Sequence, residues 1–165
     1  MLLAGLRAIC LLALMLAGAA TPARAIEQTA LPPVTVRSPE GLDVPVTGLS
    51  RDERWLILYL APDCHSCDRL LEALNAWQGR LYERVVLLVA GDPAPARAYL
   101  GTRLPVDTAL ISWYADPDGT VREALRLQGA PALFGIRRGQ IEWTISGVLN
   151  DPSTLEPVIR SWLAQ

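Results

Sequence analysis

The chain has 165 residues, of which 51% are hydrophobic and 19% are charged. Its 17 acidic residues slightly outnumber its 15 basic ones, so the formal net charge is -2 at pH 7. A mildly acidic chain argues against nucleic-acid binding, because a basic patch is the expected footprint of that function. The length fits a single domain with one proper core.

The first 25 residues have the three parts of a secretory signal peptide. Arg7 supplies the positive charge, residues 8–20 form an apolar stretch, and Ala23, Arg24 and Ala25 give the small-residue cleavage pattern. The apolar stretch has 13 residues, fewer than the ~20 that a membrane-spanning helix needs. We therefore predict cleavage after Ala25 and a protein that is periplasmic or otherwise extracytoplasmic. An uncleaved signal anchor is the alternative.

Cleavage there leaves 140 residues (165 minus 25), with a formal charge of -4 from 13 basic and 17 acidic side chains. Cys10 is lost with the signal, so Cys64 and Cys67 are the cysteines of the predicted mature chain. Residues 26–33 are polar, small and proline-containing, which predicts a flexible lead. Residues 34–165 are then expected to form one folded domain, and we expect it to be a monomer.

The first expected elements are two short strands, Val34–Arg37 and Asp43–Val46, around a turn at residues 38–41. Pro45 has no amide hydrogen to donate to a neighbouring strand, so it is tolerated only at the edge of a sheet. The pattern therefore predicts a hairpin at the edge of the sheet.

Two continuously apolar runs, Trp55–Leu60 and Val85–Val89, are typical of strands buried on both faces. Between them, apolar side chains recur at helical spacing from Cys67, and this pattern ends near Gly79. A strand, a helix and a strand at this spacing predict a right-handed crossover with a parallel pair of strands.

The C-terminal half of the chain shows weaker helical patterns and one clear hairpin. The expected elements are, in chain order, helices at Pro93–Leu100 and Val121–Leu127, an antiparallel hairpin of Ala132–Ile136 and Gln140–Ser146, and a helix at Thr154–Ala164. Pro157 falls in the first turn of the last helix, where its missing amide hydrogen has no intrahelical partner anyway. That phasing places the helix start near Thr154.

The tetrapeptide Cys64, His65, Ser66, Cys67 follows the first buried strand and opens the helical pattern. A cysteine is nucleophilic as a thiolate, which a helix N-terminus stabilises. Cys64 is therefore the expected nucleophile, and Cys67, which begins the apolar stripe, is the expected resolving and more buried partner. His65 and Ser66 are expected to tune the balance between dithiol and disulfide, while Asp63 opposes a positive charge at His65.

Other roles for this cysteine pair stay open on sequence alone. A structural staple gains most by closing a long loop, whereas a CxxC pair closes a very short one. Cys64, Cys67 and His65 suit copper(I) or zinc, yet a closed zinc site needs four ligands and the chain has no second histidine. The pair could also be idle in a partner-binding domain. Redox activity is the preferred interpretation, and we expect no cofactor.

The order of elements, the CxxC after the first buried strand and the turn Gly129, Ala130, Pro131 resemble the thioredoxin family over roughly residues 33–164. The resemblance implies an α/β thioredoxin fold, with a central mixed sheet flanked by helices and an N-terminal hairpin at its edge. That hairpin and the turn at residues 116–119 look like the exported bacterial thioredoxins of the TlpA and ResA type. Residues 58–71 and 146–150 are also similar to the methylamine dehydrogenase accessory (MauD-type) thioredoxins.

The resemblance also implies roles for individual residues. Pro131 is implied to follow a cis peptide bond and to face the CxxC, and Ala130 to offer its backbone to an extended substrate segment. Sequence chemistry alone predicts only a turn there, because about 5 to 6 per cent of X-Pro bonds are cis. Leu58 stands where thioredoxins have a buried acid, and Asp63 where an aromatic residue often precedes the first cysteine. We therefore expect resolution of mixed disulfides to be slower or to rely on another base, and we expect a dedicated client rather than a broad substrate range.

These observations predict an extracytoplasmic thiol-disulfide oxidoreductase that reduces or isomerises disulfides of a client protein through Cys64 and Cys67. A reductant outside the cytoplasm needs continual re-reduction, so a membrane electron-donor protein is the expected second partner. A DsbA-like oxidant is the alternative direction of the same chemistry, because one fold hosts both. A copper or zinc metallochaperone that uses the CxxC is the alternative class.

Overall fold

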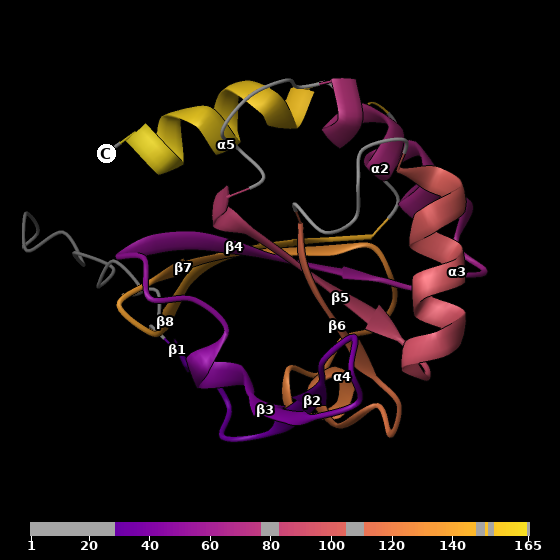
Figure 1. Ribbon diagram of the computed structural model, residues 1–165. Helices are drawn as coiled ribbons and strands as arrows, with labels where there is room; N and C mark the ends of the chain where they lie inside the picture. The colour runs from indigo at the N-terminus through magenta and orange to yellow at the C-terminus, as the bar shows by residue number, and fades with distance from the viewer. Residues whose placement is uncertain (1–28, 77–82, 105–110, 148–150, 152–153, 165) are drawn as a thin grey trace, which may run out of the picture.

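The computed structural model describes residues 29–76, 83–104, 111–147, 151 and 154–164. In these ranges eight strands form one sheet with the order β1-β8-β7-β4-β5-β6-β2-β3, and helices cover both of its faces (Figure 1). The strands are β1 (Thr29–Ala30), β2 (Thr35–Arg37), β3 (Asp43–Pro45), β4 (Arg54–Leu60), β5 (Val85–Ala90), β6 (Ser112–Asp116), β7 (Ala132–Arg137) and β8 (Gln140–Ser146). The helices are the 3-10 helix η1 (Val46–Gly48) and the α-helices α2 (His65–Ala76), α3 (Pro93–Arg103), α4 (Thr120–Ala124) and α5 (Leu155–Ala164).

The centre of the sheet consists of the two continuously apolar strands. β4 pairs in parallel with β5, and β5 with β6, whereas β7 runs antiparallel to both β4 and β8. The register places Leu58 opposite Leu87 of β5 on one side and opposite Leu133 of β7 on the other. The sheet is therefore mixed, as expected, and the predicted unit of strand, helix and parallel strand is confirmed as β4, α2 and β5.

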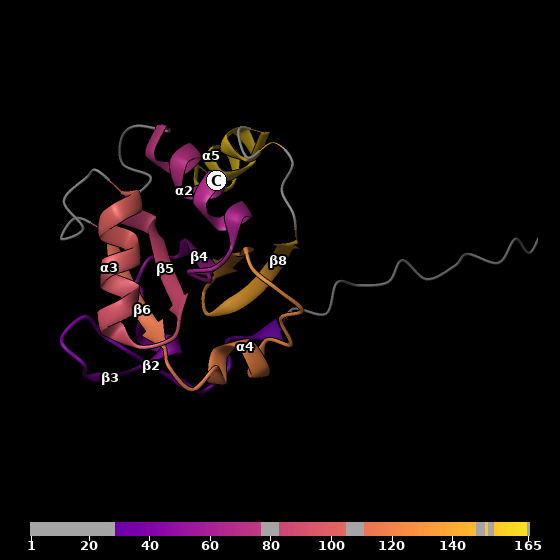
Figure 2. The ribbon, with the colours of Figure 1, turned by 90° about the vertical axis from the view of Figure 1, so that its right-hand side faces the viewer.

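Successive side chains of β4 enter two hydrophobic cores, one on each face of the sheet. Leu56, Leu58 and Leu60 contribute to a core that α2, α3 and α5 cover. Ile57 and Tyr59 contribute to a second core with residues of η1, α4 and the hairpin β2–β3. Both ribbon views show α2 and α5 on the side of the sheet opposite α4 (Figures 1 and 2). Because both faces are covered, the strand is apolar without interruption.

The predicted N-terminal hairpin is confirmed at the edge of the sheet. β2 pairs antiparallel with β3, with Thr35 opposite Pro45, and joins the sheet through the pairing of Arg37 with Ala115 of β6. Pro45 lies on β3, the outermost strand, where its missing amide hydrogen leaves no neighbouring strand unpaired. Arg37 and Asp43 add an ion pair of 3.3 Å across the hairpin.

The helix predicted at Val121–Leu127 is shorter than expected. α4 ends at Ala124, and Arg126 follows with a φ of 52°, a left-handed conformation that stops a right-handed helix. Its start is fixed by Asp116, whose carboxylate accepts the amide hydrogens of Val121 and Arg122, each at 3.2 Å. The sequence pattern shows the apolar face of this helix but not the backbone reversal that ends it.

Two strands are absent from the sequence-based prediction. β6 is short. Its buried Trp113 and Ala115 alternate with the exposed Ser112 and the half-buried Tyr114, so the strand lacks the continuous apolar run of β4. β1 falls in the segment predicted to be a flexible lead. Thr29 pairs with Ile141 of β8, and Leu31 is buried. From Thr29 onward this segment therefore packs on the domain.

The remaining elements are confirmed. α2 begins at His65, and its predicted end near Gly79 lies outside the described residues, as does the predicted signal peptide. α3 continues beyond the predicted Leu100 to Arg103. β7 and β8 form the predicted hairpin, and α5 carries Pro157 in its first turn.

Gly135 of β7 leaves room for the indole of Trp143 on the neighbouring strand β8. A Cβ atom at Gly135 would collide with that ring, which packs edge-on against Trp162 of α5 with ring centroids 5.7 Å apart. We expect Gly135→Ala to lower the free energy of unfolding by about 1–3 kcal/mol, because the methyl group displaces the indole from its packed position. Urea unfolding followed by tryptophan fluorescence measures the loss.

Gly101→Ala is the matched control for this prediction. Gly101 lies exposed on α3, where an added Cβ meets nothing within 4 Å. Alanine has a helix propensity about 1 kcal/mol better than that of glycine, so this variant is expected to gain stability. Equal stability of the two alanine variants would contradict the close packing of Trp143 on Gly135.

Candidate active site

The CxxC segment joins the end of β4 to the start of α2. The Cys64 amide donates a hydrogen bond to the Ala61 carbonyl at 3.2 Å, which closes the turn after the strand. The Cys64 carbonyl accepts from the amides of Cys67 at 2.9 Å and Asp68 at 3.2 Å, the first hydrogen bonds of the helix. Cys64 is therefore the residue immediately before α2, where unpaired amide hydrogens and the helix dipole favour a thiolate.

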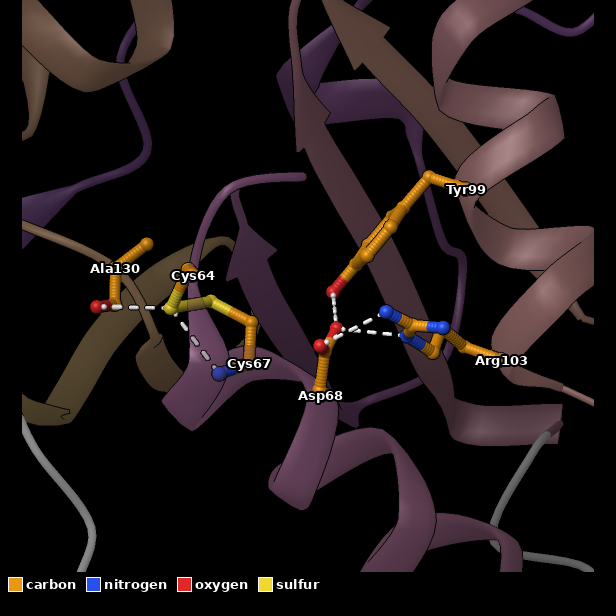
Figure 3. Close-up of a disulfide and its surroundings, with 6 residues drawn as sticks. All are labelled: Cys64, Cys67, Asp68, Tyr99, Arg103 and Ala130. Atoms are coloured by element: carbon orange, nitrogen blue, oxygen red, sulfur yellow. Dashed lines mark hydrogen bonds and ion pairs between the residues drawn. A yellow bond between two sulfur atoms is a disulfide. The ribbon is translucent and has the colours of Figure 1, made fainter.

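Cys64 and Cys67 form a disulfide across this turn, with their Cα atoms 5.1 Å apart (Figure 3). Cys67 is 0% exposed, whereas Cys64 is half-buried. The prediction that Cys67 is the more buried partner is confirmed. The Cys67 amide nitrogen also lies 3.1 Å from the Cys64 sulfur and donates to it. In the dithiol form such a donor favours the charged state of Cys64.

The turn before β7 faces the disulfide. The Ala130–Pro131 peptide bond is cis, as the resemblance implies, and the Ala130 carbonyl oxygen lies 3.3 Å from the Cys64 sulfur (Figure 3). Pro131 is buried, and its carbonyl accepts a hydrogen bond of 3.1 Å from the amide of Gly147 at the end of β8. The fold thus brings together Cys64 and Ala130, which are 66 positions apart in the chain.

His65 and Ser66 occupy the first turn of α2 between the two cysteines. The His65 side chain is exposed and Ser66 is half-buried, while Asp63 on the other side of Cys64 is exposed. Charges on His65 and Asp63 therefore act on Cys64 in contact with solvent, where salt screens them.

Leu58 occupies the place of the buried acid of thioredoxins. It is 2% exposed and shares a core with Cys67. Among the described residues the one buried carboxylate is that of Asp116, and it accepts a hydrogen bond of 3.0 Å from Tyr59, whose side chain faces the opposite core. Burial and the charge of Asp116 raise the pKa of Tyr59. Asp116 thus supports α4, and no buried carboxylate of the described chain accompanies Cys67.

A polar cluster that sequence analysis missed joins α2 to α3 beside the disulfide (Figure 3). The Asp68 carboxylate accepts a hydrogen bond of 3.1 Å from the Tyr99 hydroxyl. Arg103 holds both of its oxygens, with Nε 3.0 Å from Oδ1 and Nη2 3.1 Å from Oδ2. The hydrogen bond from Arg103 and that from Tyr99 hold the pKa of Asp68 below its ordinary value. Burial and the Asp68 hydrogen bond raise the pKa of Tyr99.

One signal for this cluster is present in the sequence. Tyr99 and Arg103 are four residues apart, so they lie on the same face of a helix. The identity of their partner is not encoded locally, because Asp68 lies on another helix and 31 positions before Tyr99.

Within the described ranges, no three His, Cys, Asp or Glu side chains come together in a group that could hold a metal ion. In that part of the chain the cysteine pair therefore lacks the further protein ligands of a closed zinc site. None of the helices described has both the length and the apolar character to cross a membrane.

The mixed sheet, the flanking helices, the CxxC at the start of α2 and the cis-proline turn opposite it define a thioredoxin-like fold. Neither a protein-family model nor a curated protein sequence matches this chain. Solved structures of the same fold do match it, at low sequence identity.

A putative protein disulfide isomerase from Bacteroides thetaiotaomicron matches with a TM-score of 0.65 and 15% identity, covering 83% of this chain and 89% of that one. A putative thiol:disulfide interchange protein DsbE from Chlorobium tepidum has a TM-score of 0.64 and 20% identity, covering 82% and 96%. A secreted Mycobacterium tuberculosis disulfide oxidoreductase homologous to E. coli DsbE has a TM-score of 0.61 and 14% identity, covering 78% and 96%. At such identities the likeness establishes the fold, and function is argued from the site.

Proposed function

We propose that this protein is an extracytoplasmic thiol-disulfide oxidoreductase that acts through Cys64 and Cys67. The observation that carries the proposal is the placement of Cys64, a half-buried residue at the start of α2 whose sulfur lies 3.3 Å from the Ala130 carbonyl oxygen. A client can reach Cys64 from solvent, while the buried Cys67 stays within disulfide distance of it. This difference in access suits an exchange in which Cys64 reacts with the client and Cys67 then resolves the mixed disulfide.

In the reducing direction, the Cys64 thiolate attacks one sulfur of a client disulfide. A bond forms between Cys64 and that sulfur, and the other client sulfur leaves as a thiolate and takes up a proton. Cys67 then loses its proton and attacks the Cys64 sulfur, which releases the first client sulfur to be protonated in turn. The client gains two electrons and two protons, and Cys64 and Cys67 end as a disulfide. A dithiol donor reverses these steps on the protein.

The neighbouring residues have supporting roles in this proposal. Ala130 offers its backbone to an extended client segment beside Cys64, and the cis bond to Pro131 holds that backbone against the sulfur. His65 and Ser66 tune the stability of the thiolate from the first turn of α2. His65 is exposed, so solvent weakens the electrostatic effect of its side chain on Cys64.

We infer reduction or isomerisation of a dedicated client as the cellular direction, with a membrane protein as the electron donor. The support is the sequence resemblance to exported thioredoxins, together with similar structures described as an interchange protein and a putative disulfide isomerase. Export is supported by the predicted signal peptide and by one similar structure described as secreted.

An oxidant of the DsbA type is the second candidate, and one observation favours it. The Cys67 amide donates to the Cys64 sulfur at the start of a helix, which stabilises the thiolate and hence the dithiol form. A protein whose dithiol form is strongly stabilised transfers its disulfide to clients.

Equilibration of the Cys64 and Cys67 pair in defined glutathione buffers, followed by alkylation and mass measurement, tests both activity and direction. A potential near about -270 mV is the expected result and identifies a reductant, whereas a potential near about -120 mV identifies an oxidant. The variant with both cysteines replaced by serine is the control. A disulfide reductase activity that survives this double replacement would refute the proposed function.

A further inference from the structure

An ion pair joins Asp68, the residue after the buried cysteine of the CxxC, to Arg103 of α3. Asp68 follows Cys67 directly, and its amide donates to the Cys64 carbonyl, so its backbone belongs to the same first turn of α2. The N-terminus of α2 stabilises the Cys64 thiolate, and the Asp68 carboxylate adds a second negative charge in the same turn. Two negative charges at one helix N-terminus oppose each other, although each alone is favoured there.

Arg103 neutralises that charge from a different helix. Its guanidinium binds both Asp68 oxygens in a two-pronged arrangement, at 3.0 and 3.1 Å, and this geometry is stronger and better oriented than a single contact. The Asp68 side chain is 19% exposed and that of Arg103 is 42% exposed, so the pair lies where solvent screens charge only in part. Tyr99 adds a third donor to the carboxylate.

The same contacts exclude Asp68 as a general base for Cys67. Three donor groups on Tyr99 and Arg103 occupy its oxygens, and they favour its charged form over a protonated one. What remains for Asp68 is an electrostatic effect on the neighbouring sulfur atoms, whose size depends on how completely Arg103 offsets its charge.

We propose that Asp68 and Arg103 are positioning residues that together set the acidity of Cys64, with Arg103 offsetting a carboxylate that would otherwise disfavour the thiolate. This inference rests on the proposed function for its significance, because a stabilised Cys64 thiolate matters only if the pair exchanges disulfides. It adds two residues to the site, neither of which belongs to the CxxC or to the cis-proline turn.

Four other charged or titratable side chains lie near this turn in the sequence. Asp63 and His65 flank Cys64 and are exposed, Arg69 follows Asp68 on α2, and Glu72 acts on Arg103 from the next turn. These groups are unchanged in the variants below, so their contributions cancel in the comparison with the parent protein.

The test compares Arg103→Gln and Asp68→Asn in the reduced, full exported protein. Thiolate absorbance is followed against pH, and mass-mapped alkylation identifies which cysteine ionises. Arg103→Gln is expected to lower the thiolate fraction of Cys64 about threefold at a pH below its midpoint, and Asp68→Asn to raise it about threefold, as expected for one partly screened charge. A threefold change in the equilibrium constant with glutathione corresponds to about 14 mV.

Opposite shifts distinguish this role from a structural one. Both variants break the same link between α2 and α3, so loss of structure alone would move the two midpoints in the same direction. Arg103→Lys keeps the charge and is expected to restore most of the parent value. Shifts of the same sign, or no shift in either variant, would overturn the proposal.

Arg138→Gln is the matched control. Arg138 pairs with Glu53 through two contacts of 3.1 and 2.7 Å, and it follows β7 at the end of the sheet opposite the CxxC. The change in net charge is the same as in Arg103→Gln, yet no shift at Cys64 is expected. If Arg103→Gln fails to fold, the nearly isosteric Asp68→Asn decides the question: a higher thiolate fraction of Cys64 supports the proposal, and an unchanged or lower fraction overturns it. Thiol ionisation remains measurable even if the pair exchanges no disulfides, so failure of the function and failure of this inference are separable.

Discussion

Cys67→Ser is expected to convert the protein into a trap that stays covalently joined to its client through Cys64. The first exchange step needs only the half-buried Cys64, whereas release of the client needs the buried Cys67 within disulfide distance. Turnover should fall by at least about a thousandfold, as is typical when one member of a catalytic unit is removed. Non-reducing gels of the exported fraction should show a new band that disappears when dithiothreitol reduces the mixed disulfide. Mass spectrometry of that band identifies the client.

Cys64→Ser is the matched control for the trap. It removes Cys64 and keeps the buried Cys67, so no mixed disulfide with the client is expected. Turnover should be lost to the same extent as in Cys67→Ser. A covalent complex that forms through Cys67 in this variant would mean that the roles of the two cysteines are reversed. Equal amounts of complex in both variants would argue against the difference in access that the structure shows.

Leu58→Asp is expected to lower the free energy of unfolding by at least about 3 kcal/mol at neutral pH. Leu58 lies between Leu87 and Leu133 in the centre of the sheet, and its replacement removes buried apolar volume and leaves a carboxylate without a partner. The position is that of the buried acid of thioredoxins, so the variant also tests whether this core accepts the residue that the resemblance leads one to expect.

The loss of unfolding free energy in Leu58→Asp should grow as the pH rises. Burial raises the pKa of the introduced carboxyl group above its unfolded value of about 3.9. Between the two pKa values the folded state binds more protons than the unfolded chain, so stability falls as the pH rises through that window. Urea unfolding at about pH 5 and about pH 8 measures the difference.

Leu58→Asn removes the same apolar volume without a titratable group, so its cost should be the same at both pH values. Subtracting the stability loss of Leu58→Asn from that of Leu58→Asp gives the part of the loss that is due to the carboxylate charge. A Leu58→Asp cost that does not change with pH would mean that water or an unsuspected cation reaches this part of the core.

Local patterns in the sequence were sufficient to predict most of the fold. The strands β4 and β5 are apolar without interruption because both of their faces are buried, and this is visible without knowing what covers them. α2, α3 and α5 show helical spacing, and the β7–β8 hairpin has a tight turn of two residues. The CxxC is likewise local, since its two cysteines are separated by one helical turn and its position follows from the strand before it.

Elements whose identity depends on distant neighbours were not predictable in this way. β6 is a strand because β5 and β2 lie beside it, and its own alternation is too short to indicate this. The pairing of Thr29 with Ile141 similarly gives structure to a segment whose composition predicts a free lead. Arg126 ends α4 through a backbone conformation that residue type does not encode.

The sequence by itself determined the chemistry of this protein: two cysteines at the start of a helix, with the second on the apolar face. The tertiary structure alone decided what surrounds them. Ala130 contacts Cys64 although the two residues are 66 positions apart in the sequence, and Arg103 contacts Asp68 although they are 35 positions apart. The physical reason is that secondary-structure propensity and hydrophobic periodicity depend on residues a few positions apart in the sequence. Which groups surround the Cys64 sulfur depends instead on how whole helices and strands pack.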